Sequence, residues 1–350
     1  MSVLPFVSVI IPCLNEESFI GKCLDSIIDN NYPKDRLEIL IIDGKSEDGT
    51  KAVLERYAHN YSFVKVFENP KKITPAALNI GIQNAKGEII VRMDAHSSYE
   101  KDYISKCIKY LNEYNADNVG GMWITVPRNN SFVAKAIAYS LSHPFGVGNA
   151  HYRIGQAKEP RWVDTVPYGC YYKEVFKKIG LFDEMLPRNE DIDFNSRLRK
   201  AGGKILLVPE IVMYYYARST FKSFFIHNFA NGVKITNPLK LDKIIFSWRH
   251  LVPLAFVSSL IGLLGLWGLL SLLSSSSSLG FLGFLLIIGS YSLCNLFFSI
   301  KIALKEKDLR YLFTMPIIFA TLHIGYGFGS VYGLLRFILS KKVRQELGKG

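Results

Sequence analysis

The chain has 350 residues, 49% of them hydrophobic, and a positive mean hydropathy, which is too apolar for an ordinary soluble protein. Its length suggests about two domains. The formal net charge of +12 would suit nucleic acid, but anionic lipid headgroups explain basic residues beside apolar stretches better. We therefore predict a membrane as partner and no nucleic acid.

The cysteines and the N-terminus indicate a reducing compartment. The five cysteines form no C-x-x-C pair and show no disulfide-framework spacing. The N-terminus lacks a basic region, and the apolar stretch after it is too short for a signal peptide. We expect the first 250 residues to remain in the cytosol.

Strands and helices alternate in the first part of the chain. The predicted strands cover residues 6–11, 38–42, 64–67 and 88–93, and helical spacing follows at 19–28, from Thr50 and at 75–85. This alternation predicts an α/β fold with a mostly parallel sheet. The loops after the first, second and fourth strands then share one edge. The residues expected in that crevice are Asn15, Asp43, Asp48 and Asp94.

The stretch Gly87–His96 carries the strongest local signal. An apolar run reads as a buried central strand, and it ends in Asp94-Ala95-His96. Two residues apart on an extended segment, Asp94 and His96 could converge on one divalent ion. In the structural alternative, Asp94 caps the next helix and His96 lies in a solvated turn.

Two common phosphate-binding motifs are missing from the sequence. It contains neither the G-x-G-x-x-G dinucleotide fingerprint nor the G-x-x-x-x-G-K-[ST] P-loop. A cation held by Asp94 and His96 could instead neutralise a departing diphosphate.

The second half of the predicted soluble region carries further elements. We expect a strand at 119–123, an apolar helix at 130–143 and a loop at 144–160. Trp162 and Tyr168 could stack on a ligand, although aromatic residues beside strands more often belong to the core. The helix near 221–229 could rest among lipid headgroups or close the catalytic domain.

The C-terminal region is expected to lie in a membrane. Residues 251–273 and 279–300 are each long enough to span a bilayer, with 274–278 as an external turn and 301–310 returning to the cytosol. The third apolar segment, 312–339, could span or be re-entrant.

Four motifs in a fixed order carry a family resemblance. They are Val7–Glu17 (VSVIIPCLNEE), Ile41–Thr50 (IIDGKSEDGT), Met93–His96 (MDAH) and Asn189–Asp191 (NED) before RLRKAGG. With these motifs the chain closely resembles the family 2 inverting glycosyltransferases of the GT-A fold, over roughly residues 5 to 220. Arg92–His96, and Gly169–Tyr171 before Phe182–Glu184, are similar to the membrane-attached enzymes of exopolysaccharide assembly, such as succinoglycan-type glucosyltransferases.

The resemblance implies roles for individual residues. The nucleotide, usually a uridine diphosphate, would be held by Pro12, Asn15, Glu16 and Asp43, with Asp48 nearby and Asn79 in the family's Asn-Gly pattern. Asp94 would contact ribose and the metal, and His96 would stand at the third position of the usual Asp-x-Asp as a ligand of Mn²⁺ or Mg²⁺. Leu78 replaces a frequent arginine, so one phosphate contact is in question.

The resemblance also implies a reaction. Asp191 would be the general base, with Glu190 positioning it, and Trp162, Tyr168 and Gly169 would lie on the acceptor side. The absence of Gln-x-x-Arg-Trp after Asp191 favours single-sugar addition.

The expected organisation follows. Residues 1–240 would be a cytosolic GT-A Rossmann-like domain with a nucleotide-sugar half (about 1–118) and an acceptor half (about 119–240), and residues 241–350 a helical membrane region. We expect a multi-pass inverting glycosyltransferase, facing the cytoplasm, that moves one sugar from a nucleotide diphosphate sugar to a lipid-linked saccharide. The alternatives are a polyprenyl-phosphate glycosyltransferase and a non-catalytic membrane scaffold. The sequence does not indicate the oligomeric state.

Overall fold

The computed structural model describes residues 4–155, 158–187, 189–235, 248–273 and 278–347. The chain forms two compact units. The first, which we call the sheet unit, comprises residues 1–125 and 151–216, and the second, the helical unit, comprises 126–150 and 217–350. The units therefore do not divide at the expected residue 240, because the segment 126–150 clusters with the C-terminal helices.

The sheet unit contains one large sheet. Its strands are β1 (Val7–Cys13), β2 (Leu37–Asp43), β3 (Val64–Glu68), β4 (Ile89–Arg92), β5 (Ser97–Tyr99), β6 (Asn118–Pro127), β7 (Arg161–Trp162), β8 (Cys170–Tyr172) and β9 (Ile205–Ala217). Within the described residues the strand order is β3-β2-β1-β4-β8-β6-β9-β5, with β7 on β9. The pairs β1–β2, β1–β4 and β2–β3 are parallel, as the strand and helix alternation predicts. Beyond β4, strands β8, β5 and β7 join their partners antiparallel.

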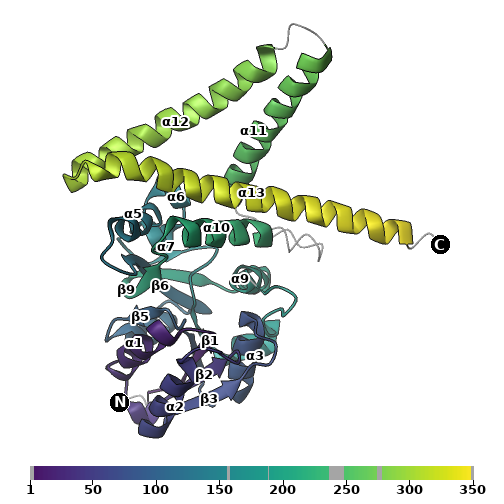
Figure 1. The fold of residues 1–350 in the computed structure, drawn as a ribbon. Helices are drawn as coiled ribbons and strands as arrows, with labels where there is room; N and C mark the ends of the chain where they lie inside the picture. Colours follow the sequence, from purple (N-terminus) through teal and green to yellow (C-terminus); the bar gives the residue numbers. More distant parts are fainter. Residues whose placement is uncertain (1–3, 156–157, 188, 236–247, 274–277, 348–350) are drawn as a thin grey trace. The chain divides into compact units, whose positions relative to one another are not determined.

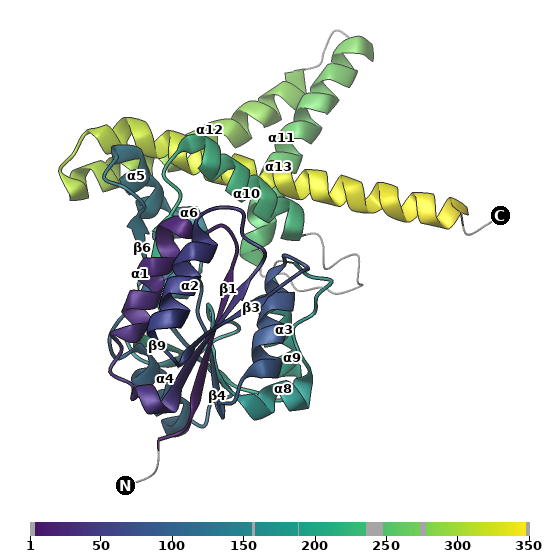
Figure 2. The ribbon, with the colours of Figure 1, turned by 60° about the horizontal axis from the view of Figure 1, so that its bottom comes forward.

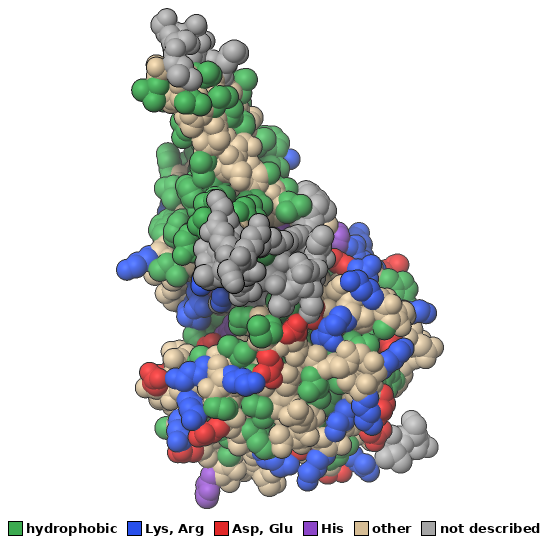
Figure 3. Space-filling model, turned by 90° about the vertical axis from the view of Figure 1, so that its right-hand side faces the viewer, with side chains coloured by type: hydrophobic (Ala, Val, Ile, Leu, Met, Phe, Trp, Pro, Cys, Tyr) green, Lys and Arg blue, Asp and Glu red, His purple; other side chains and the backbone are tan. Residues whose placement is uncertain are grey.

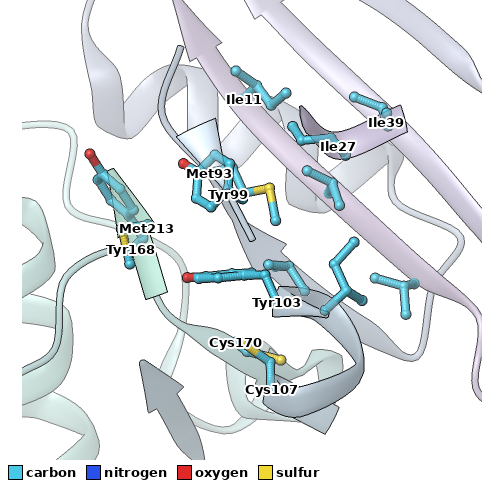
Figure 4. Packing of buried hydrophobic residues seen from close by; sticks show 14 of the residues in the cluster. Ile11, Ile27, Ile39, Met93, Tyr99, Tyr103, Cys107, Tyr168, Cys170 and Met213 are labelled. Carbon is cyan, nitrogen blue, oxygen red and sulfur yellow. The ribbon is translucent and has the colours of Figure 1, made fainter. Parts of the chain in front are cut away.

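Helices cover both faces of this sheet (Figure 2). They are α1 (Glu17–Ile28), α2 (Thr50–Asn60), α3 (Thr74–Asn84), α4 (Tyr103–Glu113), α8 (Lys173–Ile179) and α9 (Glu190–Lys200), and a short helix, α7 (His151–Ile154), precedes β7. Strand β1 explains why two layers form: Val9 and Ile11 point into the core under α1, α2 and α4, whereas Ile10 points into the core under α3, α8 and α9. Figure 4 shows part of the first core, where Tyr99, Tyr103 and Tyr168 pack with Met93 and Met213.

The helical unit carries the apolar C-terminal region. Its helices are α5 (Phe132–Ser140), α6 (Pro144–Val147), α10 (Phe221–Ile235), α11 (Trp248–Leu273), α12 (Ser278–Glu306) and α13 (Arg310–Leu347). In the described part of the chain, three helical stretches, within α11, α12 and α13, are long and apolar enough to cross a membrane. Figure 3 shows hydrophobic side chains over much of the visible surface of α11 and α12, and charged ones dispersed over the sheet unit.

Two local expectations change. The expected loop at 144–160 contains the helices α6 and α7. Helix α13 is continuous from Arg310 to Leu347, with Pro316 inside it, so the chain makes no re-entrant reversal there (Figure 1). Proline lacks an N–H, so Pro316 removes one helical hydrogen bond. The helix continues because the residues on either side of Pro316 keep their helical hydrogen bonds.

Candidate active site

The loops after β1 and β2 are joined by hydrogen bonds. Asn15 has a left-handed backbone (φ 54°), and its side-chain oxygen accepts from the Glu47 N–H at 2.9 Å. The Asn15 N–H donates to Ser46 Oγ at 2.8 Å, and Ser46 Oγ donates to Asp43 Oδ1 at 2.6 Å. Asn15 and Asp43 therefore lie side by side at the carboxyl ends of two parallel strands.

Asp48 joins the same two loops through hydrogen bonds to backbone N–H groups. Its carboxylate accepts from the Thr50 N–H at 3.0 Å and from the Glu17 N–H at 3.3 Å, at the starts of α2 and α1. The hydrogen bond from the Thr50 side chain holds the pKa of Asp48 below its usual value. Asp48 thus shapes the loops through backbone contacts.

The segment after β4 completes the cluster. The Asp94 N–H donates to the Tyr99 hydroxyl at 2.7 Å, and His96 Nδ1 lies 3.4 Å from Glu16 Oε1. The His96 ring meets the ring of Tyr215 edge-on at 5.4 Å. The prediction that these three loops meet at one edge of the sheet is confirmed by these contacts.

Arg92, the last residue of β4, joins this cluster to α9. Its Nε lies 3.3 Å from Asp94 Oδ1, and its Nη2 lies 2.9 Å from Glu190 Oε1. The side chains of Arg92 and Glu190 are 8% and 7% exposed, so the ion pair is buried. A buried pair is retained only when its geometry satisfies both charges, and here it fixes the start of α9 beside Asp94.

Burial shifts the charges of this pair in opposing ways. Burial raises the pKa of Glu190 to about 7, against the effect of Arg92 and together with that of Asp191. Burial alone would lower the pKa of Arg92, but the carboxylates of Asp94 and Glu190 raise it, so the guanidinium stays charged.

Asp191 stands next to this ion pair at the first turn of α9. Asn189 caps the helix in a left-handed conformation (φ 63°), which orients Glu190 and Asp191. Asp191 Oδ1 accepts a hydrogen bond from the adjacent Ile192 N–H at 2.8 Å. Asp191 is partly exposed and Glu190 is buried, so the two neighbouring carboxylates have different environments.

Tyr168 and Gly169 lie under the end of β4. Tyr168 is 4% exposed, and its hydroxyl is hydrogen-bonded to Ser97 Oγ at 3.0 Å. The Gly169 carbonyl accepts from the Arg92 N–H at 3.0 Å. Gly169 has φ +104°, and a Cβ there would lie 2.5 Å from Asn118 Oδ1, so the position requires glycine. Both residues contact Arg92, and the buried ring of Tyr168 is not available to stack on a sugar.

Trp162 and Asn79 do not lie with the side chains of the loops after β1, β2 and β4. Trp162 is 51% exposed on β7 and pairs with Leu206, whereas Tyr215, near His96, lies farther along β9 by roughly 30 Å of extended strand. Asn79 is buried, and its amide exchanges hydrogen bonds with the Phe182 backbone and donates to Glu184. It fastens α3 to the segment before α9.

Comparison with known proteins identifies the family. The model of glycosyl transferase family 2 matches residues 8–180. A dolichyl N-acetyl-α-D-glucosaminyl phosphate 3-β-D-2,3-diacetamido-2,3-dideoxy-β-D-glucuronosyltransferase of Methanococcus voltae is 30% identical, over 95% of this chain and 98% of its own. The chain belongs to glycosyl transferase family 2. The succinoglycan biosynthesis protein ExoA of Rhizobium meliloti is also 30% identical to this glycosyltransferase, over 73% of the chain and 76% of its own.

A solved structure agrees with the fold of this glycosyltransferase. The mannosyltransferase PcManGT of Pyrobaculum calidifontis, in complex with GDP-Man and Mn²⁺, matches 91% of the chain and 86% of its own, with a TM-score of 0.57 and 19% identity. At this identity the likeness concerns the fold alone, and it extends beyond the sheet unit. The predicted GT-A fold and enzyme class are confirmed.

The donor atoms present suit a small oxygen-preferring cation shared with a substrate. In the described parts of the glycosyltransferase, no group of three or more His, Cys, Asp and Glu side chains is placed to hold a metal ion. His96 Nδ1 nevertheless lies 3.4 Å from Glu16 Oε1, and Asp94 is two residues before His96. Mg²⁺-type sites commonly use one or two protein ligands together with phosphate oxygens. The residues fit such an ion.

Sequence reasoning missed three further side chains of this glycosyltransferase. Tyr215 lies against His96, and Trp123 and Arg153 pack with Tyr215. Arg92 was noted only as part of a motif. An arginine at the end of a buried strand, two residues before an acid, was the available signal for Arg92. No local pattern marks the other three, since they come from distant segments.

Proposed function

We propose that the protein transfers one sugar, with inversion, from a uridine diphosphate sugar to a lipid-linked saccharide at a membrane. One observation carries the proposal: Arg92 contacts both Asp94 and Glu190, so the donor-side loops and the catalytic helix meet at one place. The relative from Methanococcus voltae is named for an acceptor of this kind and matches nearly the whole chain, which supports the choice of acceptor.

The donor side would be formed by the two joined loops. Pro12, Asn15, Glu16 and Asp43 lie at or near the carboxyl ends of β1 and β2, where open α/β sheets bind nucleotides. We assign Asp94 and His96 as protein ligands of a divalent cation, Mn²⁺ or Mg²⁺. When bound, the cation would neutralise the charge that develops on the leaving diphosphate.

The acceptor side would be served by Asp191. Its carboxylate is partly exposed, so it can accept the proton of an acceptor hydroxyl while that oxygen attacks the anomeric carbon opposite the diphosphate. Glu190 is buried in its ion pair with Arg92 and cannot reach a substrate as easily. We therefore assign Glu190 to position α9, and Asp191 to proton transfer.

The apolar helices would keep this site at a membrane. The stretches within α11, α12 and α13 suit a multi-pass anchor. With the sheet unit on the cytoplasmic side, the cytoplasmic turn would be formed by the end of α12, the loop after it and the start of α13. These carry Lys301, Lys305, Lys307 and Arg310, as the positive-inside rule favours.

Asp191→Asn tests the proposed base. A positioned general base contributes about 10²- to 10⁴-fold, so the variant should lose transfer by that factor and keep the dissociation constant of uridine diphosphate. Transfer would be measured with membrane-extracted acceptor lipid, and nucleotide binding by titration calorimetry with and without Mn²⁺. Asp102→Asn, which changes an exposed carboxylate that pairs with Lys106, is the matched control.

Two outcomes would contradict the proposal. Full transfer by Asp191→Asn would favour a lipid phosphate as acceptor, because a phosphate oxygen needs no general base. A wild-type protein that binds no nucleotide diphosphate sugar, with or without Mn²⁺, would favour a non-catalytic scaffold. Guanosine diphosphate sugars in the same titration would show whether the base is uracil.

A further inference from the structure

Arg153 lies among aromatic rings beside the proposed site. From α7, its guanidinium carbon is 4.1 Å from the centre of the Trp123 ring and 5.3 Å from that of Tyr215. The Tyr215 ring meets His96, a proposed metal ligand, at 5.4 Å. Arg153 is therefore separated from His96 by a single ring.

The hydrogen-bonding capacity of this cluster is incomplete. Nη1 of Arg153 is buried and has no hydrogen-bond partner among the described residues. The same holds for Nε1 of Trp123, and for Nη1 of Arg92, whose guanidinium lies over Tyr168. All three atoms are N–H donors. A buried donor without an acceptor is destabilising, more so when it is charged, so three together need an explanation.

Other stacked arginines in the chain show what a purely structural role requires. Arg197 lies over Phe194, and its N–H groups are bonded to Asp193 and to the carbonyls of Ile179 and Leu181. Arg56 lies over Tyr57 at the exposed surface, where water can satisfy it. Arg153 has neither arrangement, because its ring contacts use the face of the guanidinium and leave a buried in-plane donor.

The chemistry that satisfies buried N–H donors without a partner is an oxyanion with acceptor oxygens only. We propose that Arg153 and Trp123 bind a phosphate group of a substrate, and that Arg153 determines affinity for it. The inference rests on the proposed function, which supplies two such groups: the diphosphate of the donor and the phosphate of the acceptor's lipid link. Guanidinium binds phosphate through paired N–H groups, and burial strengthens the contact.

Binding measurements on the full chain in detergent test this without turnover. The probes are uridine diphosphate with Mn²⁺, and farnesyl phosphate compared with farnesol, which lacks the phosphate. Arg153→Gln should weaken one phosphate probe at least about tenfold, the loss typical of one charge-assisted hydrogen bond, and leave farnesol unchanged. Weaker uridine diphosphate binding assigns the donor's diphosphate, and weaker farnesyl phosphate binding assigns the lipid link.

Three further variants keep the test decisive. Trp123→Phe keeps a ring but loses the N–H, and should weaken the same probe by a smaller factor. Arg153→Lys keeps the charge but not the planar fork, and should retain part of the affinity; it replaces Arg153→Gln should that variant not fold, as judged by its melting temperature. Arg56→Gln, the stacked but exposed arginine, should change neither affinity.

The results separate this inference from the proposed function. Unchanged affinity of both phosphate probes, within twofold, in folded Arg153→Gln or Arg153→Lys would overturn the inference and leave the proposed function intact. Failure of the wild type to bind uridine diphosphate would instead overturn the proposed donor. Loss of transfer in Asp191→Asn, with unchanged binding of the phosphate probes, supports the proposed function and is independent of the role of Arg153.

Discussion

At the scale of single residues, Arg92 is the centre of the site. It is buried, it contacts Asp94 and Glu190, and its ring neighbour is Tyr168. Removing one member of a buried ion pair costs more than the pair contributes, because the remaining charge has no partner. Arg92 therefore contributes both to the stability of the sheet unit and to the geometry of the site.

Arg92→Met should destabilise the protein by about 3–5 kcal/mol near neutral pH, because Glu190 and Asp94 lose their shared partner. The apparent melting temperature in detergent, followed by tryptophan fluorescence, measures this. The double variant Arg92→Met/Glu190→Gln should recover a large part of the loss, since no unpaired charge remains at Glu190. Equal melting temperatures of the single and double variants would contradict a coupled pair.

Glu190 should give the stability of the protein a characteristic pH dependence. Its pKa is raised from 4.5 to about 7, so between these values the folded protein binds more protons than the unfolded chain. The contribution of Glu190 to the free energy of unfolding should therefore fall as the pH rises from 4.5 to 7, by an amount on the order of 3 kcal/mol, and level off above 7.

Glu190→Gln should lack this decline, and comparing its melting temperature with that of the wild type across pH 4.5–7 isolates the effect. The carboxylates whose pKa values are lowered, Glu38, Asp48 and Glu184, lose their contributions at lower pH, below their usual values. Parallel curves for the two proteins would show that another group is responsible.

At the scale of elements, glycines set the contact between α10 and α13. A Cβ on Gly329 of α13 would lie 2.1 Å from the carbonyl oxygen of Phe229, and one on Gly232 of α10 would lie 2.0 Å from that of Tyr326. The two backbones thus approach closely at both positions, as small residues allow between membrane helices. Within the helical unit α10 packs on α13, whereas its two expected roles, resting among headgroups or closing the catalytic domain, stay predictions.

Gly329→Ala should separate these helices and destabilise the helical unit by about 1–3 kcal/mol, the usual cost of overpacking against a rigid backbone. The matched control is Gly262→Ala on α11, where a Cβ would meet nothing within 4 Å. Melting temperatures in detergent would compare the two. A neutral Gly329→Ala, with the same melting temperature as its control, would contradict close packing at this crossing.

At the scale of the whole molecule, the segment 126–150 belongs to the helical unit, although it is far in sequence from the C-terminal helices of that unit. Within the helical unit, the Phe132 ring lies 4.7 Å from that of Tyr311, and Phe145 lies 4.9 Å from Phe319. His323 Nε2 is hydrogen-bonded to the Phe145 carbonyl at 2.9 Å. Helix α13 therefore covers apolar side chains of the segment 126–150. Along the chain, this segment lies between the strands β6 and β7.

A truncated protein ending at residue 247 should consequently aggregate, because it exposes the apolar side chains of α5 and α6 that α13 covers. Size-exclusion chromatography measures this. A protein ending at residue 217, which also lacks α10, with residues 128–148 replaced by a Gly/Ser linker should be monodisperse. A monodisperse simple truncation would show that the chain divides near residue 240, as the sequence suggested.

The sequence by itself determined the elements and the class of chemistry. Alternating apolar and helical periods predicted β1 to β4 with their helices, because these periods are local and the parallel strands are buried on both faces. The motifs around Asn15, Asp43, Asp94 and Asp191 pointed to family 2, and the uncharged C-terminal stretches predicted the apolar helices.

Only the tertiary structure decided which side chains meet. The contacts of Arg92 with Glu190, and of Arg153 with Trp123 and Tyr215, join residues far apart in the chain, and no local period records them. For the same reason Trp162, an attractive sugar platform in sequence, lies at the other end of β9. Side-chain burial and long-range pairing depend on the folded chain as a whole, because they are set by packing between elements and not by the propensities within them.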